Sequence, residues 1–117
     1  MLGKKNLSHT VICESGGVIF FRFPKNLYQV ESVHFLDIEK SRKKSFVDAF
    51  TKSGKKLERG FIPQAGNALP TELEPADWFQ VKRLKIVLRT SAAVSRLELV
   101  FCEGGGKDIC GLCALFY

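Results

Sequence analysis

Apolar and polar residues alternate with a period of two along much of this chain, as side chains alternate between the two faces of a sheet. The segment VKRLKIVLR is the clearest case, with Leu84, Ile86 and Leu88 on one face. Lys85 and Arg89 fall on the opposite face. The same alternation predicts strands over residues 9–13, 16–23, 30–39, 45–51, 57–62, 81–89 and 96–102. Turn signals between these segments are typical of an antiparallel β-sandwich or barrel.

The segments between the strands are polar or rich in proline and glycine. Residues 90–95 are predicted to turn the chain before the last strand. Three prolines and a glycine in the link 63–78 predict no regular element there, apart from one helical turn at 76–79. A helix over 41–50 is the alternative to a strand at 45–51.

For the segment 30–39, the alternation also predicts which residues share a face of the strand. Over 30–39 the alternation places Leu36 and Ile38 on one face of the strand. It places Phe35 and Asp37 on the other face.

At 117 residues the chain has the length of one domain that can bury its own core. Composition divides it into an N-terminal tail (1–9), a β-sandwich (10–103) and a glycine-hinged tail with a CxxC pair (104–117). The sequence lacks the roughly 18 consecutive apolar residues that a membrane-spanning helix needs, so we expect no such segment. We also see no apolar signal region at the start.

Three segments in order, GGVIFFRFP, VESVHFLDIE and VKRLKIVLRTSAAVSRLELVF, resemble the galactose-binding-like (discoidin-type) jelly roll. The resemblance covers residues 16–101, with 36–39, 52–55 and 91–97 matching motifs of small modules in secreted and cell-surface microbial proteins. It implies an antiparallel jelly-roll sandwich of about seven to eight strands. It also implies a binding module for glycans, lipids or protein partners, rather than an enzyme.

Departures from that family pattern concern its acidic positions. Lysines replace the acidic turn at 52–55, and Ser95 and Arg96 stand where aspartates often flank the last hairpin. These changes argue against an acidic or calcium-type contact.

The four cysteines allow several interpretations. In this architecture the first and last strands lie side by side, and discoidin-type modules often join their ends by a disulfide, which makes Cys13 and Cys102 a disulfide candidate in an oxidising compartment. Cys110 and Cys113 have CxxC spacing. A four-thiolate zinc site is one alternative, because the glycine hinge at 104–106 can fold the CxxC pair back onto the terminal strands, although a strong zinc signal consists of two close pairs. A thioredoxin-like redox pair is another, but it needs a βαβ context that the sequence does not show. The plainer interpretation is an apolar tail that packs on the sandwich or a partner.

Positive charge is concentrated between residues 40 and 59. Eight basic residues and two acids lie there, so this stretch carries +6, which equals the net charge of the whole chain. It predicts polyanion or partner binding, with nearby phenylalanines available for stacking. The alternative is that the lysines are solvated hairpin tips and the phenylalanines face the core. The basic residues are Lys40, Arg42, Lys43, Lys44, Lys52, Lys55, Lys56 and Arg59.

The proline-rich link 63–79 contains candidate ligand-binding residues. Lectin-like jelly rolls stack loop aromatics on sugars, so Trp78 is the candidate platform, with Gln64, Asn67 and Glu72 as polar contacts. The alternative is that Trp78 plugs the end of the sandwich. The loop acids do not form a recognisable catalytic pair, and neither histidine has metal-ligand spacing.

These observations favour a non-catalytic binding or assembly module. It would be a small accessory subunit of a larger complex, docking through the basic stretch and the apolar tail 112–117. The alternative is a carbohydrate- or ligand-binding module of an extracellular protein. We expect protein partners, with a glycan or polyanion as a further ligand. We expect no catalytic residue, metal or cofactor, and the compartment is left open.

Overall fold

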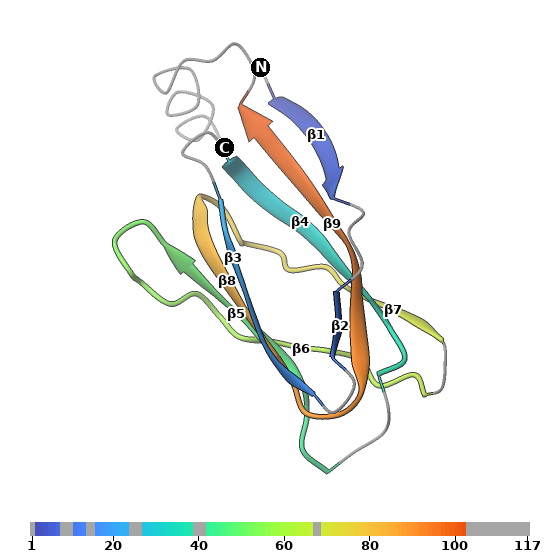
Figure 1. Cartoon of the computed structure of the whole chain (residues 1–117). Coiled ribbons are helices and arrows are strands. Elements are labelled where there is room, and N and C mark those ends of the chain that lie inside the picture. The colour runs from blue at the N-terminus through green and yellow to red at the C-terminus, as the bar shows by residue number, and fades with distance from the viewer. Residues whose placement is uncertain are drawn as a thin grey trace.

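The computed structural model describes residues 2–7, 11–13, 16–23, 27–38, 42–66 and 69–102, with the backbone alone described at 2–7, 11–13 and 102. The regular elements in these ranges are nine strands in two antiparallel sheets (Figure 1). This confirms the predicted all-β antiparallel sandwich. The strands are β1 Leu2–Leu7, β2 Val11–Cys13, β3 Gly17–Arg22, β4 Leu27–Leu36, β5 Phe46–Thr51, β6 Gly60–Phe61, β7 Pro70–Leu73, β8 Val81–Leu88 and β9 Ala92–Cys102.

The first sheet is organised around β9, its longest strand. Its order is β1-β9-β4-β7, and β2 also pairs with β9. The register places Val11 opposite Val94 and Leu7 opposite Leu97, so β2 and β1 follow one another along the same strand. On its other side β9 pairs with β4 through a ladder that contains three irregularities. The first strands of the chain therefore lie beside the last one, as expected from the sequence.

The second sheet is organised around β8 and has the order β3-β8-β5-β6. β8 pairs along β3 on one side and β5 on the other. β3 enters the sheet at Gly16, which has a φ of 86° and whose added Cβ would lie 2.6 Å from the carbonyl oxygen of Leu88. Only glycine satisfies both conditions at this close approach.

The core lies between the two sheets and follows the predicted alternation. Leu84, Ile86 and Leu88 of β8 are buried, as are Leu97 and Leu99 of β9. Full burial of such a side chain contributes roughly 1.5–3 kcal/mol relative to its exposure. These strands therefore supply a large part of the apolar surface that holds the sandwich together.

Three segments differ from the sequence prediction. Residues 2–7, expected as part of a tail, form β1, and residues 70–73 of the proline-rich link form the edge strand β7. β9 begins at residue 92, inside the segment predicted to be a turn. Pro70 is tolerated because it is the first residue of an edge strand. The expected helical turn at 76–79 is wrong, because Phe79 forms an isolated bridge with Gln29.

The phase predicted for the end of β4 is also wrong. Phe35 is fully buried, whereas Leu36 is exposed. The register between β4 and β9 shifts between His34 and Phe35, which breaks the strict alternation. Asp37 then adopts a positive φ of 61°, and the chain turns Ile38 back into the core.

The backbone register contradicts the proposed Cys13–Cys102 disulfide. Cys13 pairs with Ala92 at the start of β9, whereas Cys102 pairs with Leu2 at its end. Ten residues of strand separate these positions, which is roughly 33 Å. The Cα atoms of a disulfide lie only about 4.4–6.8 Å apart. The expectation was wrong because the strand 11–13 pairs with the opposite end of β9. Cys110 and Cys113 lie outside the described residues.

Candidate binding surface

The outward side of the second sheet brings apolar and basic residues into three rows across its strands. The first row is Val18, Val87, Phe46 and Phe61, the second is Phe20, Lys85 and Asp48, and the third is Arg22, Arg83 and Phe50. Directly paired residues of an antiparallel sheet share a face. Four further cations border these rows, and we call the whole set the basic–aromatic face. They are Lys44, Lys56, Arg59 and Arg89.

Large apolar side chains are exposed on this face. Phe20 is 66% exposed and Val18 is 50% exposed on the edge strand β3, and Phe61 is 55% exposed on β6. Single exposed apolar residues are common on protein surfaces, but adjoining ones often mark an interaction site. Among the described strands β3 pairs only with β8, so Val18 and Phe20 stand at one edge of the sheet, and Phe61 on β6 stands at the other.

Cations lie over the aromatic rings of the same face. The guanidinium carbon of Arg59 is 3.7 Å from the ring centroid of Phe46, and that of Arg89 is 5.5 Å from the same centroid. Arg83 lies 5.3 Å from the ring of Phe50. These distances fall within the range of favourable cation–π contact. The face therefore interleaves positive charge with ring surface.

Asp48 is the one acid among the residues of the basic–aromatic face. Its buried carboxylate accepts two hydrogen bonds from Arg59, at 2.8 and 3.0 Å, and lies 3.5 Å from the ammonium of Lys56. The hydrogen bond to Asp48 raises the pKa of Arg59 above its ordinary value. Seven cations and one carboxylate leave this face with a formal charge of +6.

The predicted basic stretch is divided by the fold. Arg42, Lys43 and Lys44 precede β5, whereas Lys52 and Lys55 follow it. The six residues of β5 separate the two groups by roughly 20 Å. Lys40 lies outside the described residues.

Sequence reasoning missed four cations of the face that lie elsewhere in the chain: Arg22, Arg83, Lys85 and Arg89. The alternation in VKRLKIVLR already placed Lys85 and Arg89 outward, and this was the available signal. What the sequence did not indicate is that β8 lies between β3 and β5. The pairing adds the cations of β8 to the phenylalanines of β5.

The proposed sugar platform in the link 63–79 is contradicted by the burial of Trp78. This side chain is only 1% exposed, and its Nε1–H donates to the carbonyl oxygen of Glu58 at 3.1 Å. Its own carbonyl accepts from the backbone N–H of Val30. The indole therefore closes the space between the segments before β6 and β8, as the plug alternative predicted.

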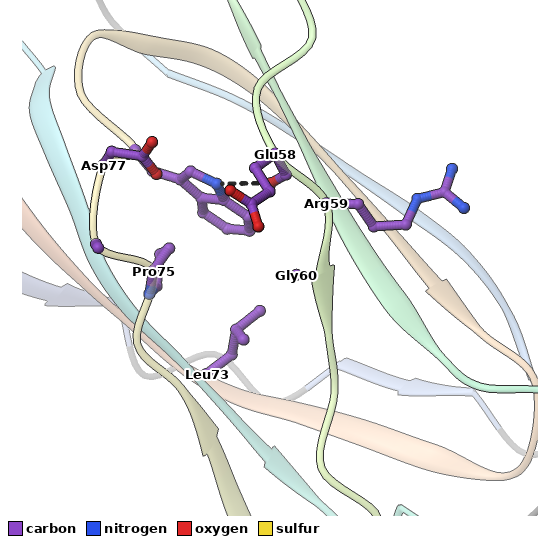
Figure 2. A pocket seen from close by; sticks show the side chains of 8 residues that line it. Glu58, Arg59, Gly60, Leu73, Pro75 and Asp77 are labelled. Atoms are coloured by element: carbon purple, nitrogen blue, oxygen red, sulfur yellow. Dashed lines mark hydrogen bonds between the residues drawn. The ribbon is translucent and has the colours of Figure 1, made fainter.

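A small hollow remains beside the indole. It has a volume of about 190 Å³ and is lined by Glu58, Arg59, Gly60, Leu73, Pro75, Ala76, Asp77 and Trp78 (Figure 2). Typical ligand pockets measure roughly 300–1,000 Å³. In Figure 2 the guanidinium of Arg59 points away from the hollow, towards β5. The hollow is thus small for a ligand site and lacks an inward-pointing cation.

Of the described polar residues proposed around Trp78, neither Gln64 nor Glu72 lines the hollow beside its indole. Glu72 lies on β7, where it pairs with His34 of β4. Gln64 is half-buried in the segment after β6. Asn67 lies outside the described residues. The described residues therefore give a sugar site at Trp78 neither an exposed ring nor these two polar contacts.

A separate polar cluster lies on the first sheet around His34. Its Nε2 is 3.0 Å from the Ser32 hydroxyl and 2.9 Å from a Glu98 carboxylate oxygen. The same Glu98 oxygen accepts a hydrogen bond from Arg96 at 2.9 Å. A catalytic triad uses the two ring nitrogens of histidine for the nucleophile and the acid separately. Here both partners meet one nitrogen, which differs from the arrangement of a triad.

Two further features of the described residues bear on function. They contain no group of three or more histidine, cysteine, aspartate or glutamate side chains that could hold a metal ion. In the same residues, no helix is long and apolar enough to span a bilayer.

Comparison with known proteins yields a likeness of fold. No family model matches the chain, and no curated protein matches its sequence. A structure of Bacillus endospore appendages, described as disulfide-linked pili, is 6% identical, covers 86% of this chain and 87% of its own, and has a TM-score of 0.51. At this identity the likeness concerns the fold alone.

Two further solved structures share less of the geometry. The SPBc2 prophage-derived protein YomS is 14% identical and covers 86% of this chain and 95% of its own, with a TM-score of 0.42. A Streptococcus pneumoniae fucose-binding module is 13% identical and covers 72% and 69%, also with a TM-score of 0.42. The galactose-binding-like jelly-roll type stays a prediction.

Proposed function

We propose that this chain is a non-catalytic binding module that docks onto a macromolecular partner through the basic–aromatic face. The observation that carries the proposal is the joint exposure of Val18, Phe20 and Phe61 on a sheet face with a formal charge of +6. Burial of these side chains against a partner supplies apolar energy, and the cations favour an acidic partner. In a larger complex the chain acts as an accessory subunit.

The apolar tail 112–117 is a second docking element in this proposal. It lies outside the described residues, so its role rests on its sequence, which ends in Leu115, Phe116 and Tyr117. The carbohydrate-binding alternative has less support, because its central residue, Trp78, is buried. We propose no catalytic role, since the best-placed polar cluster joins Ser32 and Glu98 to the same nitrogen of His34.

The native mass of the protein in a gentle cell extract tests the proposal. Size exclusion followed by immunoblotting is carried out on the wild type and on the variant Phe20→Ala/Phe61→Ala/Arg83→Gln. We expect the wild type in a large particle and the variant in a free species near its own mass of 13.1 kDa. The control is Leu69→Ala, which removes an exposed apolar side chain outside this face. If the variant elutes with the large particle as the wild type does, the face is not the docking surface.

A further inference from the structure

We infer that the partner of the basic–aromatic face is a single-stranded nucleic acid. The inference rests on the proposed function and deepens it by naming the partner class. Surfaces that bind single strands combine cations that follow the phosphates with aromatic rings on which bases stack. Both components are present on this face, where cations of β8 lie beside phenylalanines of β3 and β5.

The exposed rings are placed for stacking on separate bases. Phe20 lies on β3 and Phe61 on β6, at opposite edges of the four-stranded sheet. Three strand spacings, roughly 14 Å in all, separate these edges. A strand of nucleic acid that crosses the sheet therefore meets one ring at each side. A duplex hides its base faces within its own stack, so these rings favour unpaired bases.

The cations lie between and around the two rings. Lys85 is paired with Phe20 across the β3–β8 ladder, and Arg83 with Arg22. Lys44 lies 5.9 Å from the ring centroid of Phe61. The carboxylate of Asp48 is already paired with Arg59 and Lys56. Its negative charge is therefore compensated within the protein and repels a bound phosphate less. The path from one ring to the other is thus lined by positive charge.

Among the described side chains of the first sheet, carboxylates gather on β4, β7 and β9, which gives the nucleic acid a preferred side of the sandwich. The polar cluster of that sheet includes Glu72 and Glu98 beside His34. A hydrogen bond with Glu72 raises the pKa of Glu74, and the nearby negative charges of Glu72, Glu98 and Glu31 raise it further. This clustering of carboxylates disfavours phosphate on the first sheet.

Fluorescence anisotropy with the purified full chain tests the inference. The probes are labelled oligo-U and oligo-dT of about 15 nucleotides, near the upper site size of single-strand-binding folds. A duplex of the same length and unlabelled heparin serve as competitors. We expect binding that weakens with salt, a preference for single strands over the duplex, and a loss of about tenfold or more in Phe20→Ala/Phe61→Ala.

Two other variants separate charge from stacking. Arg83→Gln/Arg89→Gln removes two cations and is expected to reduce the slope of log affinity against log salt by about 1.4, at about 0.7 for each phosphate contact. Lys52→Gln/Lys55→Gln removes the same charge from the turn after β5 and is expected to change affinity less. Phe20→Leu/Phe61→Leu removes both rings but keeps apolar side chains of similar volume. It replaces the alanine variant in the stacking test if that variant fails to fold.

Several results would overturn the inference. Absence of binding at low salt, equal binding of the duplex, or unchanged affinity in both the alanine and leucine variants would each do so. If affinity is unchanged in both variants and heparin competes fully, the face binds any polyanion through its charge alone, without stacking of bases. A different outcome is that the oligonucleotides do not bind, but the variant Phe20→Ala/Phe61→Ala/Arg83→Gln still elutes as a free species instead of in the large particle. The basic–aromatic face then binds an acidic protein. The proposed function would then survive without the nucleic acid.

Discussion

Arg59 and Asp48 form an ion pair with two parallel hydrogen bonds, Nε to Oδ1 at 2.8 Å and Nη2 to Oδ2 at 3.0 Å. The carboxylate of Asp48 is 4% exposed, whereas the side chain of Arg59 is 37% exposed. The pair satisfies a charge buried on β5 and joins β5 to the segment before β6. It also places the guanidinium over Phe46, so one contact serves both the stability of the sheet and the charge of its outer face.

Removing Arg59 is expected to destabilise the protein, because Lys56 at 3.5 Å is then the one ion-pair partner of Asp48 among the described residues. Arg59→Gln leaves a buried carboxylate poorly compensated, whereas Arg59→Gln with Asp48→Asn removes both charges. Urea unfolding of the two single variants and the double variant measures the coupling. We expect the double variant to be more stable than the sum of the single losses predicts. Simple additivity would contradict a coupled pair.

Trp78 is expected to be a structural residue. Trp78→Ala should lower the free energy of unfolding by about 3–5 kcal/mol, since it deletes a buried indole and leaves a cavity. Leu69→Ala, at an exposed site, should change it by no more than about 0.5 kcal/mol. Chemical denaturation of both variants provides the comparison. A small loss in Trp78→Ala would mean that the indole is not part of the core.

Much of the fold could be predicted from the sequence because alternation reports which side of a strand is buried. Leu84 and Leu97 illustrate this, since both lie inward as their segments indicated. The strands β1 and β7 were missed, because their residues, KKNL and PTEL among them, are polar and lie at sheet edges. Edge strands are held by backbone pairing and need no apolar alternation.

The candidate site was predicted less completely, because it depends on which strands are neighbours. The sequence indicated a basic stretch with Phe46, Phe50 and Phe61 nearby, and these rings do lie among cations. It did not indicate that Arg83 and Phe20 share their face. That relationship is set by long-range pairing, for which local alternation contains no signal.

Glu74 provides a prediction on pH. Its hydrogen bond with Glu72, followed by the charge of Glu72, raises its pKa in the folded protein. A carboxyl with a raised folded pKa stabilises the fold below its ordinary pKa, and this contribution is lost as pH rises through the raised value. Glu74→Gln should therefore be more stable than the wild type at neutral pH, with the difference shrinking in acid.

Thermal unfolding from about pH 4 to 8, which runs from just below the ordinary pKa of glutamate to well above it, tests this effect. Glu58→Gln removes one exposed carboxylate from another part of the surface and is the matched control. A stability difference for Glu74→Gln that stays constant across this range would contradict the raised pKa of Glu74.

The cysteines of β2 and β9 are expected to remain unlinked to each other. Because the register places Cys13 and Cys102 at opposite ends of β9, no bond between them is compatible with the fold. Peptide mapping of the alkylated, non-reduced protein should find no Cys13–Cys102 peptide. Its detection in the native protein would mean that the register of β2 or β1 is wrong.

Deletion of residues 107–117 is expected to leave the melting temperature nearly unchanged. Among the described residues, the buried cluster of the core draws on residues from Phe23 to Leu99. The deletion should nevertheless release the protein from its complex if the tail is a docking element. A collapse in stability would instead place the tail in the core.

Oxidative footprinting of Phe20 and Phe61 tests the central claim most directly, because it reports on the two exposed rings in the native particle. Hydroxyl-radical labelling is compared between the isolated protein and the particle recovered from a gentle extract, with exposed Leu69 as the internal reference. We predict that both phenylalanines are protected in the particle while Leu69 is labelled equally in both samples. Equal labelling of Phe20 and Phe61 in the two samples would contradict docking through the basic–aromatic face.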